Sequence, residues 1–112
     1  MNEAVLADPV LARVKHELET LYGTRLKRVV LYGSRARGDH GPESDYDILV
    51  VLEGPVERWP EQERLSDLAS KLEWEAVGRG EPVALSLKPM TEEQMKQRTG
   101  FMHNVRLDGV EL

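Results

Sequence analysis

Two short apolar segments, separated by a loop rich in glycine, constrain the fold of this chain more than any other feature. The segment 26–32 is almost continuously apolar from Val29, and the segment 48–52 (ILVVL) is apolar throughout. Runs of this length are typical of strands that are covered on both faces. The loop between them contains Gly33, Gly38, Gly41 and Pro42, enough breakers to predict no regular element there. The sequence therefore predicts two core strands joined by an irregular loop.

Helical patterns flank these two strands. Asp8-Pro9 is a typical helix start, and the apolar residues after it recur at helical spacing until Gly23. A second helix is predicted from Pro60 to about Gly78. The apolar stripes of the two helices are Val10, Val14, Leu18 and Leu21 in the first, and Leu65, Leu68, Leu72 and Ala76 in the second. Trp74 lies off the second stripe, which predicts an exposed side chain.

The remaining third of the chain predicts a third strand and more helix. The segment 82–87 (PVALSL) reads as a strand that begins with proline. Thr91 and Gln94 form a capping box for a short helix, and the tail 101–112 predicts one or two helical turns followed by an extended end. The order helix, strand, strand, helix, strand, helix predicts an α/β (α+β) fold, a small mixed sheet with helices packed on it.

The composition limits the class of protein. A length of 112 residues predicts a single domain over 1–112, and 40% apolar with 31% charged residues is ordinary for a globular protein. The net charge of -5 argues against direct, sequence-independent binding of nucleic acid. The chain has no cysteine and no apolar run near the roughly 18–20 residues of a membrane span. We therefore expect a cytoplasmic protein without a membrane partner.

The loop after the first strand has the chemistry of a phosphate site. Gly33 lets the backbone approach a ligand closely, and Ser34 adds a hydroxyl beside backbone N–H groups. Arg35 and Arg37 bring guanidinium groups, which match the geometry of phosphate oxygens. Each feature alone also suits an ordinary turn or a charged surface. Together they favour a nucleotide-binding site made of these four residues.

Two carboxylates, Asp45 and Asp47, open the second apolar segment with Tyr46 between them. Alternate residues of a strand share a face, so these carboxylates project side by side. They repel each other unless a cation lies between them, and such hard oxygen ligands favour Mg²⁺, which completes its shell with water and substrate phosphates. The alternative is a solvated strand edge with turn-capping carboxylates. The spacing from Gly33-Ser34 favours a catalytic Mg²⁺-nucleoside triphosphate site.

The stretch GSRARGDHGPESDYDILV, residues 33–50, resembles the signature of the polymerase-β-like nucleotidyltransferases. Its first seven residues, GSRARGD, resemble the corresponding motif of the minimal nucleotidyltransferases (MNT) of that superfamily. The resemblance implies that Gly33 and Ser34 hold the β,γ-phosphates and that Asp45 and Asp47 hold the metal ions. It also implies transfer of a nucleoside monophosphate from a triphosphate such as ATP to a hydroxyl, with release of pyrophosphate. Many bacterial MNT proteins are antitoxins paired with a HEPN-domain RNase, and some add AMP to a tyrosine of that partner.

The chain departs from the family pattern on its third strand. Active members usually supply a third carboxylate there, whereas this chain has Ala84 at the expected position, or Ser86 if the register is shifted by two. Two hypotheses follow. The chain is either a Mg²⁺-ATP-dependent enzyme that adenylylates a HEPN partner, or a catalytically weakened antitoxin that binds nucleotide and acts by contact alone. Transfer to a small molecule, as in aminoglycoside nucleotidyltransferases, requires an acceptor-binding domain that these residues lack.

Overall fold

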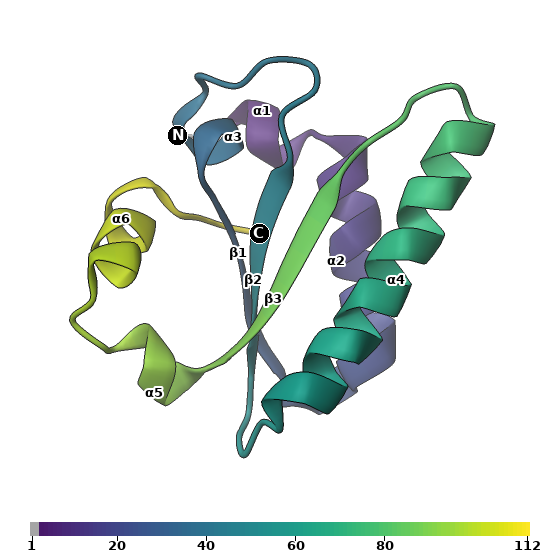
Figure 1. Cartoon of the computed structure of the whole chain (residues 1–112). Coiled ribbons are helices and arrows are strands. Elements are labelled where there is room, and N and C mark those ends of the chain that lie inside the picture. The colour runs from purple at the N-terminus through teal and green to yellow at the C-terminus, as the bar shows by residue number, and fades with distance from the viewer. Residues whose placement is uncertain (1–2) are drawn as a thin grey trace.

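The computed structural model describes residues 3–112 (Figure 1). Its elements in chain order are α1 (Glu3–Leu6), α2 (Pro9–Tyr22), a 3₁₀ turn (Gly23–Arg25), β1 (Leu26–Tyr32), α3 (Ser34–Arg37), β2 (Tyr46–Leu52), α4 (Arg58–Gly78), β3 (Leu85–Thr91), α5 (Glu92–Met95), α6 (Gly100–Asp108) and β4 (Val110–Glu111). Among these helices, none is both long and apolar enough to cross a bilayer.

The four strands form one mixed sheet in the order β3-β2-β1-β4. β1 is antiparallel to β2 and to β4, whereas β2 and β3 run parallel. The connection between the parallel pair is α4, as expected for a strand–helix–strand unit. The predicted α/β class and mixed sheet are therefore confirmed.

Helices cover both faces of the sheet. In Figure 1, α2 and α4 lie on one face, and α5 and α6 lie on the other. Leu18, Ile48 and Leu65 belong to the larger core under α2 and α4, and each has a relative exposure of 0%. Leu49 and Met102 belong to the smaller core under α5 and α6. Because alternate residues of β2 enter the two cores, the strand needs an unbroken apolar run, as the sequence indicates.

The predicted first helix is present, but its buried stripe differs from the prediction. The spacing predicts Leu21 in the stripe, yet this residue is 42% exposed, whereas the neighbouring Tyr22 is buried. The Tyr22 hydroxyl donates a 2.7 Å hydrogen bond to the buried carboxylate of Glu61, on α4. Arg25 donates to the other oxygen of that carboxylate at 3.1 Å. A polar contact thus draws the aromatic residue inward, and spacing of apolar residues alone does not reveal it.

Two further predictions about secondary structure are wrong. The loop after β1 is not irregular throughout, because residues 34–37 form the single helical turn α3 between Gly33 and Gly38. The third strand covers Leu85–Thr91 rather than 82–87, and it contains Pro89. A proline is tolerated here because β3 is an edge strand, where a missing N–H breaks no ladder hydrogen bond.

Side chains cap the outer edge of β3. The backbone N–H of Leu85 donates to Glu73, and Gln62 donates to the carbonyl of Leu87. The N–H of Thr91 donates to Gln94 in the predicted capping box. Edge strands with satisfied polar groups resist pairing with another sheet. The edge of β3 is therefore occupied, and its exposed side chains lie on the face of the sheet that also carries Asp47.

Candidate functional site

The aspartates predicted to bind metal lie at the start of β2, on the face that α5 and α6 cover only in part. Asp47 pairs in register with Tyr32 of β1 and with Ser86 of β3. Asp45 precedes the strand by one residue and is exposed, whereas Asp47 is half-buried. Burial, and then the charge of Asp45, raise the pKa of Asp47 above its ordinary value of 3.8. The second contribution is the repulsion between two nearby negative charges, which a bound cation would relieve.

Gly33 brings the loop backbone against this carboxylate. Its backbone angles, φ 78° and ψ -159°, lie in a region that only glycine adopts readily. A β-carbon at this position would lie 2.6 Å from Oδ2 of Asp47. The glycine is therefore required twice, by its conformation and by the close approach. Ser34 follows directly at the start of α3 and is half-buried, so the Gly-Ser turn begins beside Asp47, and the predicted roles of these residues remain predictions.

Arg35 does not join this group. Its Nε donates a 2.8 Å hydrogen bond to the carbonyl of Ser44, and its guanidinium carbon lies 3.9 Å from the ring centroid of Tyr46. The Tyr46 hydroxyl donates to Asp8 at the start of α2, so this ring lies on the α2 side of the sheet. Tyr46 alternates with the two aspartates, which places Arg35 on the opposite face of β2. The structure shows Arg35 positioning the loop, and its predicted phosphate contact remains a prediction.

Arg37 is also engaged elsewhere. Its Nε donates a 3.1 Å hydrogen bond to Asp39, and its Nη1 lies 3.8 Å from a carboxylate oxygen of Asp108, the last residue of α6. The hydrogen bond to Asp39 contributes most to raising the pKa of Arg37. The side chain is 44% exposed, so a bound nucleotide would compete with two surface ion pairs for it. Its predicted phosphate contact also remains a prediction.

The register of β2 and β3 shows which residues occupy the place of a third carboxylate. Ser86 lies directly beside Asp47, and the carbonyl of Ala84, two residues before Ser86, accepts a hydrogen bond from the N–H of Tyr46. Within residues 3–112, no group of three His, Cys, Asp or Glu side chains is arranged to hold a metal ion. The two aspartate side chains provide hard oxygen donors of the kind that Mg²⁺ binds, with its remaining ligands coming from phosphate and water. The donor set therefore fits one Mg²⁺ ion.

Three residues outside the predicted site lie on the same face of the sheet as the aspartates. Lys88 follows Ser86 by two residues on β3 and therefore shares its face, with its Nζ 4.6 Å from the ring centroid of Phe101. The Phe101 ring packs edge-on against Tyr32 at 5.3 Å, and Tyr32 is the register partner of Asp47. The sequence could have placed Lys88 on this face by the alternation of side chains along a strand, but the predicted third strand ends at residue 87. The positions of Tyr32 and Phe101 depend on tertiary packing.

The sheet topology and the glycine turn beside the aspartates indicate a nucleotidyltransferase fold. The chain belongs to the nucleotidyltransferase domain family, whose model matches residues 11–107. This match confirms, at the level of the family, the resemblance found in the sequence.

Two curated relatives, both from Methanocaldococcus jannaschii, carry the name "Putative protein adenylyltransferase". One is 53% identical over 51 residues, which is 46% of this chain and 47% of the relative. The other is 32% identical over 62 residues, which is 55% of this chain and 62% of the relative. The chain thus spans about half to three fifths of the length of the curated relatives it matches.

Solved structures share the fold. A toxin–antitoxin complex described as a mutant of MntA-HpeT aligns with a TM-score of 0.60 at 21% identity, over 90% of this chain and 70% of the other. A toxin–antitoxin structure with AMP-PNP aligns with a TM-score of 0.56 at 22% identity, over 88% of this chain and 69% of the other. At this level of identity the similarity establishes a common fold.

Proposed function

We propose that this chain binds Mg²⁺-ATP between the Gly33-Ser34 turn and the carboxylates of Asp45 and Asp47, and transfers AMP to a hydroxyl of a partner protein. The observation that carries the proposal is the close approach of Gly33 to Asp47, where a β-carbon on the glycine would lie 2.6 Å from Oδ2. In the proposed site, this approach brings the turn that would bind phosphate beside a carboxylate that would bind the metal. The names of the curated relatives support adenylyl transfer as the reaction.

Each residue then has a definite role. Asp45 and Asp47 hold the metal, which when bound neutralises phosphate charge, and their mutual repulsion is relieved at the same time. Gly33 and Ser34 bind the β,γ-phosphates. The acceptor oxygen forms a bond to the α-phosphorus while the bond to pyrophosphate breaks. Ser86 is not a base at neutral pH, so the proton of the hydroxyl passes to solvent or to a group of the partner.

We propose a HEPN-domain toxin as the partner, with this chain as its antitoxin. The toxin–antitoxin neighbours support this role, and the AMP-PNP in one of their titles supports ATP as the nucleotide. A second candidate function has its own observation. Because Ser86 takes the place beside Asp47, the chain is alternatively a nucleotide-binding antitoxin that neutralises its toxin by contact without transfer.

Isotopic labelling distinguishes the two functions. The purified chain is incubated with Mg²⁺ and a HEPN-domain protein encoded beside it, once with ATP labelled at the α-phosphate and once at the γ-phosphate. Adenylyl transfer predicts that only the α label remains on the partner. Retention of the γ label would contradict the proposed reaction. If neither label is retained while the partner is still inhibited, the chain acts by contact alone.

A further inference from the structure

The sheet order indicates the side from which an acceptor approaches. The proposed phosphate-binding turn follows β1, the aspartates lie at the start of β2, and β3 lies on the other side of β2. Phosphoryl and nucleotidyl transfer proceed with the attacking and leaving oxygens roughly in line. If pyrophosphate is held at Gly33-Ser34, on the β1 side, the acceptor hydroxyl must arrive from the β3 side. The exposed face of β3 is therefore the acceptor side of the site.

Two cations lie on this side. Lys88, on β3, and Arg58, the first residue of α4, line the same cavity of about 190 Å³, together with Met90 and Gln62. Across residues 3–112, neither cation has a carboxylate oxygen within 4.0 Å. Each lies over an aromatic ring instead, Lys88 at 4.6 Å from the centroid of Phe101 and Arg58 at 5.7 Å from that of Trp59. Both cations therefore keep their capacity to bind an anion.

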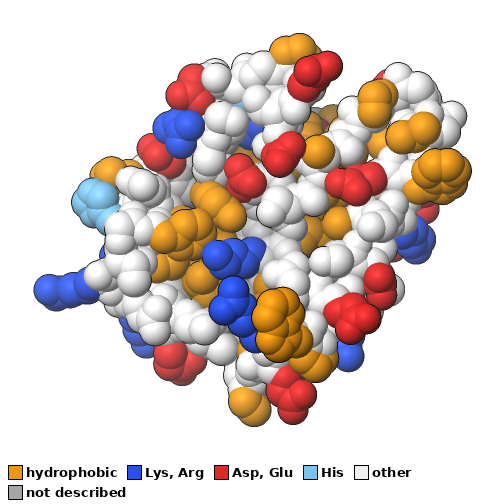
Figure 2. Space-filling model, viewed as in Figure 1, with side chains coloured by type: hydrophobic (Ala, Val, Ile, Leu, Met, Phe, Trp, Pro, Cys, Tyr) orange, Lys and Arg blue, Asp and Glu red, His pale blue; other side chains and the backbone are white. Residues whose placement is uncertain are grey.

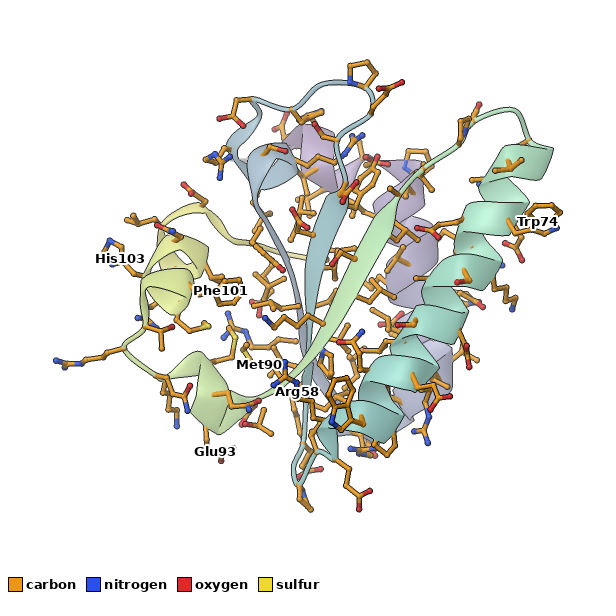
Figure 3. The ribbon with its side chains drawn as sticks, viewed as in Figure 1. Arg58, Trp74, Met90, Glu93, Phe101 and His103 are labelled. Atoms are coloured by element: carbon orange, nitrogen blue, oxygen red, sulfur yellow. The ribbon has the colours of Figure 1, made fainter. Side chains whose placement is uncertain are left out.

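The side chains lie on one open surface. In Figure 2, basic side chains occupy the middle of this face, with hydrophobic side chains on both sides and acidic ones above. Figure 3 shows Arg58 beside Met90 in front of the sheet, and Phe101 on α6 to their left. Trp59 is 76% exposed and Phe101 is 38% exposed, so apolar surface flanks the cations. We call Arg58, Trp59, Lys88 and Phe101 the β3 surface.

We infer that the β3 surface binds an acidic segment of the acceptor protein, which carries the hydroxyl that receives AMP. This inference rests on the proposed function, because that function defines the acceptor side. Two cations that have no carboxylate partner among residues 3–112, on a chain with a net charge of -5, complement carboxylates of a partner. The rings of Trp59 and Phe101 provide the flat apolar contact that an aromatic side chain such as tyrosine prefers. Two cations are too few to hold a nucleic-acid backbone, so a polypeptide is the better complement.

A peptide-binding experiment tests the β3 surface without requiring catalysis. The probe is a fluorescein-labelled peptide with one tyrosine between glutamates, compared with the same peptide carrying glutamines, and binding is followed by fluorescence anisotropy. Charge reversal by Arg58→Glu with Lys88→Glu should weaken binding of the acidic peptide about tenfold or more, since two exposed ion pairs become two repulsions. A peptide with lysines in place of the glutamates should bind the reversed variant better than the wild type.

The control variant is Lys96→Glu with Arg98→Glu, which changes the net charge equally at two exposed residues outside the β3 surface. It should bind the acidic peptide like the wild type. Equal binding of the glutamate and glutamine peptides, or equal losses in both variants, would refute the inference. Tighter binding of a single-stranded RNA of similar charge would refute it in favour of a nucleic-acid acceptor.

Mg²⁺-ATP affinity is measured on the same proteins. It should change less than about twofold in the β3-surface variant, a difference of about 0.4 kcal/mol. If it falls as much as peptide binding does, Arg58 and Lys88 contact the nucleotide and the inference is wrong. If the wild type itself does not bind Mg²⁺-ATP, the proposed function fails, which this measurement distinguishes from a failure of the β3 surface alone.

Discussion

Replacing Gly33 by alanine should damage both stability and the site. At φ 78° and ψ -159° the backbone lies in a region that costs a residue with a side chain about 1–3 kcal/mol. The new methyl group would also lie 2.6 Å from Oδ2 of Asp47, so this carboxylate must rotate away. For a domain of this size, 1 kcal/mol lowers the melting temperature by about 4 °C, which predicts a loss of about 4–12 °C. Differential scanning calorimetry measures it, and calorimetric titration should show that Mg²⁺-ATP binding is lost.

Two other glycines of the loop serve as matched controls. Gly38 has φ 84° and ψ 8°, and a β-carbon added there would have nothing within 4 Å, so Gly38→Ala reports the cost of a left-handed backbone without a steric contact. Gly41 has equally open surroundings and no positive φ, so Gly41→Ala should leave the melting temperature nearly unchanged. The variant Gly33→Ala with Asp47→Ala relieves the steric contact and should recover part of the lost stability. The reasoning is refuted if Gly33→Ala melts like Gly41→Ala and binds Mg²⁺-ATP normally.

Three more substitutions test other parts of the account. The raised pKa of Asp47 means that its ionised form is disfavoured in the folded state, so stability falls as the pH rises through that pKa. Asp47→Asn should therefore melt above the metal-free wild type at pH 7, and thermal melts below pH 3.8 should show no such advantage. Arg35→Ala removes the contacts to Ser44 and Tyr46, so it should lower the free energy of unfolding by about 1–3 kcal/mol. It should also speed amide hydrogen exchange over residues 38–45, and unchanged exchange would contradict the positioning role of Arg35. Ser86→Asp adds a third carboxylate beside Asp47, and should lower the melting temperature without metal and restore part of it with Mg²⁺-ATP.

Local patterns in the sequence are sufficient to predict most of the fold. The apolar run 48–52 reflects a strand with both faces covered, and the cap at Asp8 and the capping box at Thr91 occur as predicted. Trp74 is exposed, as its position off the helical stripe indicates. The predicted strand 82–87 is wrong at both ends, since β3 begins at Leu85 and continues through Pro89, which only its position at the edge of the sheet allows.

Some residues of the candidate site could likewise be predicted from the sequence, whereas others depend on tertiary packing. Gly33 and the aspartates could be placed together because the antiparallel pairing of β1 with β2 returns the chain to the same end of the sheet. The direction of Arg35 could not be predicted, because it depends on the ring of Tyr46 and the path of residues 38–45. Lys88 and Arg58 are distant in sequence and meet only through the packing of α4 on the sheet. Contacts of this kind leave no local pattern.

The most direct test of the central claim is a calorimetric titration of ATP into the wild type and into Asp45→Asn with Asp47→Asn, each with and without Mg²⁺. The account predicts that Mg²⁺ strengthens binding to the wild type by about tenfold or more, a difference of about 1.4 kcal/mol, and has little effect on the variant. The variant must first be shown to fold by its melting curve. Equal affinity in all four conditions would contradict the assignment of the metal-nucleotide site to these two aspartates.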